Sequence, residues 1–119
     1  MKTFELNITG GDDVALDVAI TRDGVPLDLT GATLWFTMKT SADLDDNHAT
    51  VQLTIGDGIT IVDAEAGTAS VLLSRTITND LVVGTTYLTD LQVKDAAGLV
   101  STAASGKVRV RQQITRAEA

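Results

Sequence analysis

The amino-acid sequence predicts an all-β fold, and three features of its pattern support this prediction. Apolar and polar residues alternate in short runs, as in Val14, Leu16, Val18 and Ile20, which places one face of a strand inward. Turn residues, mostly Gly and Asp, close each run after about ten residues. No segment has the helical period of about 3.6 residues over a useful length. Seven to nine strands at this spacing favour a single immunoglobulin-like antiparallel sandwich over a barrel.

The first two strands are expected at residues 2–9 and 14–22. The second ends at Asp23-Gly24, where the tolerance of glycine for a positive φ allows a tight turn. Pro26 follows, and its ring fixes φ and removes the backbone N–H. Residues 25–30 are therefore expected to form an edge or crossing segment.

Four further strands are expected in the middle of the chain, and each is identified by its alternating apolar residues. The longest polar stretch, residues 41–50, separates the first of them from the second and is expected to be a loop. The first strand has an inward face of Leu34, Phe36 and Met38. The alternating residues of the other three are Val51, Leu53 and Ile55; Ile59 and Ile61; Ala69, Val71 and Leu73.

The alternation breaks over residues 74–81, where we expect a single helical turn capped by Ser74 or Thr76. A strand with Tyr87, Thr89, Leu91 and Val93 facing inward follows Gly84. Asp95-Ala96-Ala97-Gly98 has the composition of a type I turn. Residues 99–105 and 107–113 then form one long strand, or two strands bent at Gly106.

The alternation also predicts the core and one specific hydrogen bond. Tyr87 is expected to form a tyrosine corner, in which its hydroxyl bonds a backbone group within residues 79–84. The predicted core consists of Leu6, Ile8, Leu16, Val18, Ile20, Leu34, Phe36, Met38, Leu53, Val71, Leu73, Tyr87, Leu91, Val93, Val108 and Val110.

Length and composition limit the class of protein. The 119 residues suit one domain, residues 1–119, with residues 112–119 as a C-terminal tail. The chain has no cysteine, which excludes disulfides and thiolate chemistry. A net charge of −7 disfavours binding to nucleic acid or an anionic membrane.

The sequence contains little that points to catalysis or metal binding. Asp43, Asp45 and Asn47 have the spacing of a calcium loop, but His48 stands where glycine is needed and Thr54 where glutamate is needed. We therefore expect a metal-free loop. No nucleophile elbow, phosphate loop or dinucleotide motif is present. We expect no enzymatic activity, cofactor or small-molecule substrate.

Several residues are candidates for an interface. Trp35 falls on the outward phase of its strand, where it either covers the sheet edge under a loop or anchors a subunit contact. Leu72 and Leu88 also fall on outward phases, and an exposed apolar patch marks an interaction surface. Arg109 and Arg111 belong to a basic final stretch, whereas the first half of the chain is acidic. These charges are either solvated faces or complementary ends that meet on neighbouring copies.

Several segments resemble small immunoglobulin-like virion proteins of tailed phages, and most closely the N-terminal domain of phage baseplate upper proteins. The central segment Pro26-Leu27-Asp28-Leu29-Thr30-Gly31 is the most specific of them. The others are Ile8 to Asp13, Gly58 to Ile61 with Ala66 to Thr68, Gly84 to Leu91, Gly106 to Val110 and Ile114 to Arg116.

This resemblance implies a non-enzymatic structural protein of a virion assembled in the host cytoplasm. It would dock on a tail, baseplate or capsid lattice, with other virion subunits and copies of itself as partners. The alternative is a carbohydrate-binding or adhesive module that uses Trp35 and the acidic loop. A hydrolase would have to use His48, the only histidine.

Overall fold

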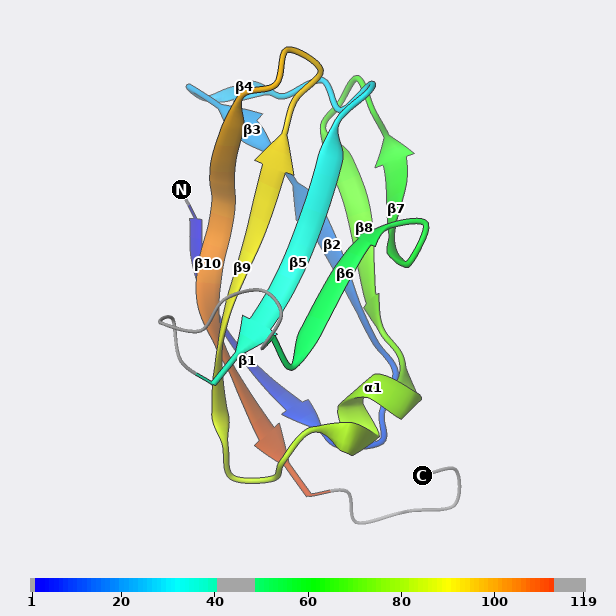
Figure 1. Ribbon diagram of the computed structural model, residues 1–119, viewed down its shortest axis with the longest axis vertical. Helices are drawn as coiled ribbons and strands as arrows, with labels where there is room; N and C mark the ends of the chain where they lie inside the picture. The colour runs from blue at the N-terminus through cyan, green and yellow to red at the C-terminus, as the bar shows by residue number, and fades with distance from the viewer. Residues whose placement is uncertain (1, 41–48, 113–119) are drawn as a thin grey trace.

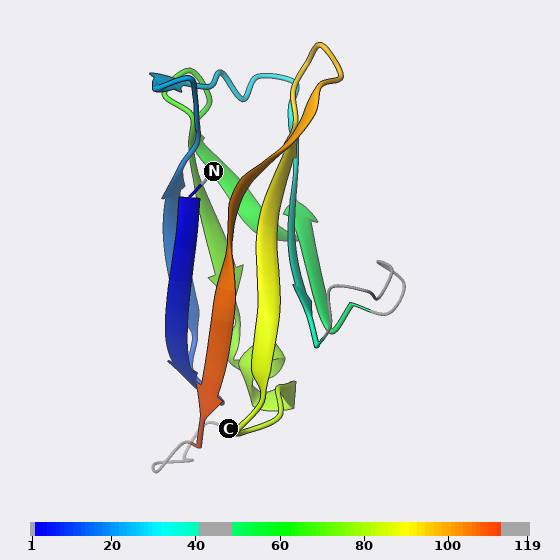
Figure 2. The ribbon, with the colours of Figure 1, turned by 90° about the vertical axis from the view of Figure 1, so that its left-hand side faces the viewer.

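The computed structural model describes residues 2–40 and 49–112, which form a sandwich of two strand layers (Figures 1 and 2). Apart from one short helix, all regular structure is β, so the all-β prediction is confirmed. In chain order the elements are β1 (Lys2–Thr9), β2 (Val14–Ala19), β3 (Thr21–Arg22), β4 (Val25–Pro26), β5 (Thr33–Lys39), β6 (Val51–Ile55), β7 (Gly58–Asp63), β8 (Thr68–Leu73), α1 (Arg75–Asp80), β9 (Thr86–Lys94) and β10 (Val100–Arg111).

Eight strands belong to one sheet that folds over on itself, in the order β1-β10-β9-β5-β6-β7-β8-β2. We call β10, β9, β5 and β6 the front layer, and β7, β8 and β2 the back layer; β1 pairs with β10 at the side of the front layer and lies behind it (Figures 1 and 2). Most neighbours are antiparallel, but β1 runs parallel to β10 over its whole length. Strands β3 and β4 pair only with each other.

The predicted strand over residues 14–22 is divided in the structure. β2 ends at Ala19, and the chain changes partner at Ile20, whose N–H still donates to the carbonyl of Gly67 beyond the end of β8 at 2.8 Å. The carbonyl of Ile20 accepts from Leu27 at 2.9 Å. A side chain at Gly67 would collide with the backbone of both neighbours, since a Cβ there would lie 2.5 Å from the carbonyl oxygen of Ile20. This crossing point therefore requires glycine.

The final strand, β10, is continuous from Val100 to Arg111, which confirms the predicted alternative of one long strand. Its pairing with β9 shifts between Thr102 and Ala104, so the irregularity is a bulge at that point and not a bend at Gly106. Gly106 has a different role. A Cβ there would collide with the backbone carbonyl of Phe4 on β1.

The helix α1 and the tyrosine corner confirm two local predictions. Ser74 caps α1, and its Oγ accepts from the N–H of Ile77 at 3.4 Å. The hydroxyl of the buried Tyr87 accepts from the N–H of Val82 at 2.9 Å, inside the predicted range 79–84. The C-cap of α1 is Leu81, so this bond fixes the chain just beyond the helix.

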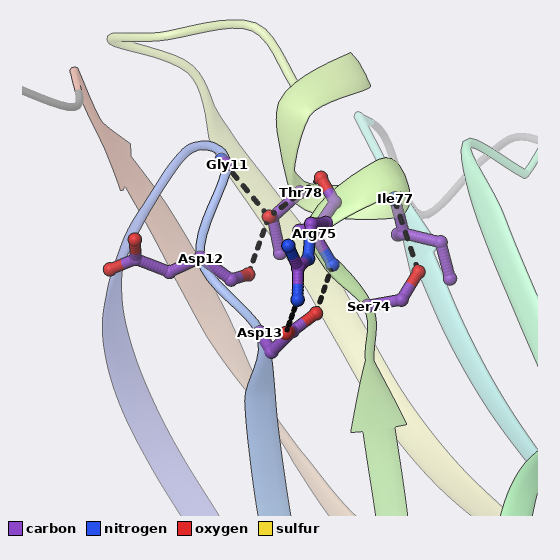
Figure 3. Close-up of polar contacts among 7 residues, drawn as sticks. All are labelled: Gly11, Asp12, Asp13, Ser74, Arg75, Ile77 and Thr78. Atoms are coloured by element: carbon purple, nitrogen blue, oxygen red, sulfur yellow. Dashed lines mark hydrogen bonds and ion pairs between the residues drawn. The ribbon is translucent and has the colours of Figure 1, made fainter. Parts of the chain in front are cut away.

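A set of polar contacts ties α1 to the turn between β1 and β2 (Figure 3). The fully buried Thr78 hydroxyl donates to the carbonyl of Asp12 at 2.7 Å and accepts from the N–H of Gly11 at 3.1 Å. The carboxylate of Asp13 accepts from both the backbone and the side chain of Arg75, at 2.6 and 3.2 Å. The Thr78 hydroxyl thereby satisfies the backbone N–H of the buried Gly11, whereas the contacts between Asp13 and Arg75 are exposed.

Most of the predicted core is buried, but three members are not. Leu6, Leu16 and Val18 are only half-buried, because they lie on β1 and β2, which each have one neighbour in the sheet. Ile55, at the end of β6 and outside the predicted core, is 38% exposed. The buried predicted residues are Ile8, Ile20, Leu34, Phe36, Met38, Leu53, Val71, Leu73, Tyr87, Leu91, Val93, Val108 and Val110.

Candidate functional site

The front layer carries a hollow of about 930 Å³ on its solvent-facing side. Residues from β1, β5, β6, β9 and β10 line it, so it crosses the width of the layer. Trp35 and Leu88 supply apolar surface, and most of the other lining side chains are polar. A hollow of this size is within the range of about 300–1,000 Å³ for ligand and anchor pockets.

Strand register arranges the lining residues in transverse rows. Trp35 on β5 lies opposite Thr54 of β6 and Gln92 of β9. In the next row Thr37 lies opposite Gln52 and Asp90, and the side-chain amide of Gln52 donates to the Thr37 hydroxyl at 3.4 Å.

The third row holds charged residues on either side of Leu88. Leu88 lies opposite Lys39 of β5 and Lys107 of β10, and Lys107 lies opposite Glu5 of β1. Two cationic and two anionic side chains, counting Asp90, therefore line the hollow. The hollow is locally balanced in charge, although the chain as a whole carries −7.

The structure brings together two of the three predicted apolar interface residues. Trp35 and Leu88 face outward, as predicted, and both line the hollow, where they are half-buried. Leu72 is 46% exposed, but it lies on β8 in the back layer. Leu72 is therefore not part of a patch with Trp35.

Arg109 and Arg111 continue from the hollow along β10. Both are exposed, and together with Lys107 they form a basic stripe on the outward phase of this strand. A guanidinium nitrogen of Arg109 lies 3.5 Å from a carboxylate oxygen of Glu5, and both side chains are more than half exposed. Ion pairs this exposed contribute little to folding, about 0–1 kcal/mol.

Acidic side chains occupy the opposite end of the molecule, which is uppermost in Figure 1. Asp23 lies in the β3–β4 turn, Glu65 in the β7–β8 turn and Asp95 in the β9–β10 turn. Arg22 pairs with Asp95 at 2.7 Å and connects the β3–β4 hairpin to the β9–β10 turn. The hydrogen bond from Arg22, followed by the one from the N–H of Leu99, lowers the pKa of Asp95.

Sequence reasoning missed how this acidic end is built. Glu65 and Asp95 come from the second half of the chain, so the acidic first half is not the spatial unit. It also missed the polar partners of Trp35 in the hollow, Gln52 and Gln92. The alternation of the sequence predicts that both glutamines face outward. Their position near Trp35 depends on which strands are neighbours in the sheet, which the alternation does not determine.

The loop considered for metal binding cannot be placed, because residues 41–48 lie outside the described residues. Asp43, Asp45, Asn47 and His48 are among them. Across residues 2–40 and 49–112, no group of three or more His, Cys, Asp or Glu side chains could hold a metal ion. No helix in these ranges is long and apolar enough to cross a membrane.

A family model described as the BppU N-terminal domain matches residues 5–102. The chain belongs to this family. BppU N-terminal domains are those of phage baseplate upper proteins, which supports a structural role in the phage virion, at the baseplate. No curated protein shows significant sequence similarity to this BppU N-terminal domain.

Solved structures with the same fold come from phage and from animal cell-surface proteins. The N-terminal domain of phage TP901-1 ORF48 matches this BppU domain with a TM-score of 0.57 and 14% identity, over 92% of this chain and 94% of that one. The NK cell receptor Nkp44 matches with a TM-score of 0.53 and 15% sequence identity, over 92% of this chain and 99% of the receptor chain. A structure from a study of VGSC beta subunits matches with a TM-score of 0.53 and 11% sequence identity, over 97% of this chain and 95% of that one. At these identities the likeness establishes the fold alone.

Proposed function

We propose that this BppU domain is a non-enzymatic docking module of a phage virion, assembled in the host cytoplasm. It would contact neighbouring subunits through the outward side of the front layer. The observation that carries this proposal is Trp35, which faces out of the sheet into the hollow rather than into the core. Trp is enriched among the residues that dominate interface energies.

The surroundings of Trp35 suit a protein interface. Leu88 adds apolar area in the same hollow, and polar side chains surround both residues. This arrangement of an apolar centre within a polar rim is typical of subunit contacts. Arg109 and Arg111 extend the surface along β10 and offer charge for orienting a partner.

Incorporation into particles tests the role of Trp35. Trp35→Ala should reduce the amount of the chain in purified virions at least about tenfold, because truncating an interface anchor commonly costs 2 kcal/mol or more. Leu72→Ala is the matched control, since it removes an exposed apolar side chain from the back layer. Equal incorporation of Trp35→Ala and the parent chain would exclude the hollow as the docking surface.

A second candidate function is binding of a neutral saccharide in the hollow. The observation that favours it is the grouping of Trp35 with the amides of Gln52 and Gln92 and the carboxylate of Asp90. An aromatic face with nearby hydrogen-bonding groups suits a sugar ring. Trp35 is the only Trp in the chain, so its fluorescence reports on the hollow directly. A saturable shift with neutral oligosaccharides would favour this function, and an unchanged spectrum favours docking.

A further inference from the structure

Among residues 2–40 and 49–112, nothing pairs with the outer edge of β2. β2 is the last strand in the sheet order and pairs only with β8. β1, the strand at the other end of the order, is also an edge and pairs only with β10. On an open edge, alternate N–H and C=O groups remain available to another extended chain.

The edge formed by β2 lacks three features that commonly prevent strand addition, namely a bulge, a proline and a lysine. Its register with β8 is unbroken from Val14 to Ala19, so no bulge twists it away. The strand contains neither Pro nor Lys. Its exposed side chains are Ala15, Asp17 and Ala19, which are small. Natural edge strands are commonly blocked by a bulge, a proline or a lysine. A regular edge without them is a template for β-augmentation.

The inward side chains beside this edge are incompletely covered. Val14, Leu16 and Val18 on β2 are half-buried, although they pack against the core. Leu6 on the other open edge is half-buried as well. An added strand with aliphatic residues on its inward phase would cover this surface, and each Å² of apolar area removed from water contributes about 25 cal/mol.

The charge on the edge indicates which kind of strand would fit. Asp17 is exposed at the middle of β2 and has no hydrogen-bond or ionic partner among the described residues. Pairing β2 with β2 of a second copy, inward phases matched, would place the two Asp17 side chains opposite or diagonal to each other. Like charges in such positions are destabilising. The charge therefore favours a basic strand of a different protein.

We propose that β2 accepts an extended segment of another virion subunit, which adds a strand to the back layer. This segment carries aliphatic residues at alternate positions and a Lys or Arg facing Asp17. The inference rests on the proposed virion role, but it concerns a surface separate from the Trp35 hollow.

A fusion tests the edge without any other subunit. The strand Thr-Val-Lys-Val-Thr-Val is joined before β1 through a Gly/Ser linker of about 12 residues, which spans roughly 19 Å on average. This span matches a six-residue strand of about 20 Å, and β1 begins at the end of the molecule where β2 ends (Figure 1). In the control fusion, Pro replaces the first and the second of the three Val residues of the added strand.

The first fusion should raise Tm by about 3–6 °C relative to the Pro control. Asp17→Lys should remove part of this rise in the fusion and leave Tm of the unfused chain nearly unchanged. Equal Tm values for the two fusions would show that the edge does not accept a strand and would overturn the inference.

Hydrogen exchange then compares purified particles with the free chain. Amides of residues 14–19 should exchange at least tenfold more slowly in particles, while the helix α1, which belongs to no proposed docking surface, serves as an internal reference. If the chain is present in particles and β2 exchanges as in the free chain, the inference fails and the docking function stands. If the chain is missing from particles, the proposed function itself fails.

Discussion

Two buried threonines illustrate, at the scale of single residues, that a hydroxyl can stabilise or destabilise the same sandwich. Thr78 is fully buried and makes the hydrogen bonds that hold α1 to the β1–β2 turn. Thr89, on the inward phase of β9, is 5% exposed, and its hydroxyl oxygen has no hydrogen-bond partner in the part of the chain that the structure describes. A buried polar group without a partner costs about 1–3 kcal/mol.

The same substitution should therefore have opposite effects at the two positions. Thr89→Val should raise the free energy of unfolding by about 1 kcal/mol, because it removes an unsatisfied hydroxyl of similar shape. Thr78→Val should lower it by about 1–3 kcal/mol, because it leaves the N–H of Gly11 and the carbonyl of Asp12 without their partner. Urea unfolding of the two variants and the parent measures both changes. A destabilised Thr89→Val protein would show that this hydroxyl has a partner in solution.

At the scale of elements, the sequence predicts what local rules determine. Alternation, turn composition and capping correctly predicted most of the strands, α1 and the Tyr87 hydrogen bond, although the strand expected over residues 14–22 is divided into β2 and β3. The position of each strand in the sheet depends on contacts between distant segments, so Leu6, Leu16 and Val18 were wrongly assigned to the core. The same limit explains Leu72. The phase of a residue tells which side of its own strand it occupies, but not to which layer that strand belongs.

The contact between the β3–β4 hairpin and the β9–β10 turn should depend on pH. The folded-state pKa of Asp95 is lowered, chiefly by the hydrogen bond from Arg22. A lowered pKa means that this contact contributes fully above the unfolded-state value of about 3.9. Its contribution is lost as the pH falls through the still lower folded-state pKa. Asp95→Asn should therefore be less stable than the parent at pH 7 and lose this difference near pH 2. Thermal unfolding at both pH values measures it, and a constant difference would contradict the assignment.

The polar loop of residues 41–50 remains a prediction from sequence. His48 and Thr54 replace the glycine and glutamate that a calcium loop needs. Calorimetric titration with calcium should therefore show no saturable binding in the micromolar range. Binding that Asp45→Ala abolishes would contradict this prediction.

At the scale of the whole molecule, we propose that copies meet through unlike surfaces. The basic stripe on β10 would lie against the acidic turns at the opposite end of a neighbouring copy. Contacts between unlike surfaces build rings or extend along a lattice.

Replacing Arg109 and Arg111 together by Glu should therefore weaken assembly most at low salt. Exposed charges are screened beyond about 10 Å at 0.1 M salt. Sedimentation or virion incorporation at low and high salt should show a difference between parent and variant that shrinks as salt rises. A difference that is independent of salt would argue against an electrostatic contact.

The parallel pairing of β1 with β10 determines how the domain would bear a pulling force. β1 enters at one end of the molecule and β10 leaves at the other (Figure 1), and the two strands are paired from Lys2 with Ala104 to Thr9 with Arg111. Tension applied across the first and last strands would load all these backbone hydrogen bonds in shear, so that they must rupture together rather than peel apart singly. Forced unfolding depends on the unfolding rate and not on equilibrium stability. The domain should therefore resist stretching along this direction far better than its free energy of unfolding suggests.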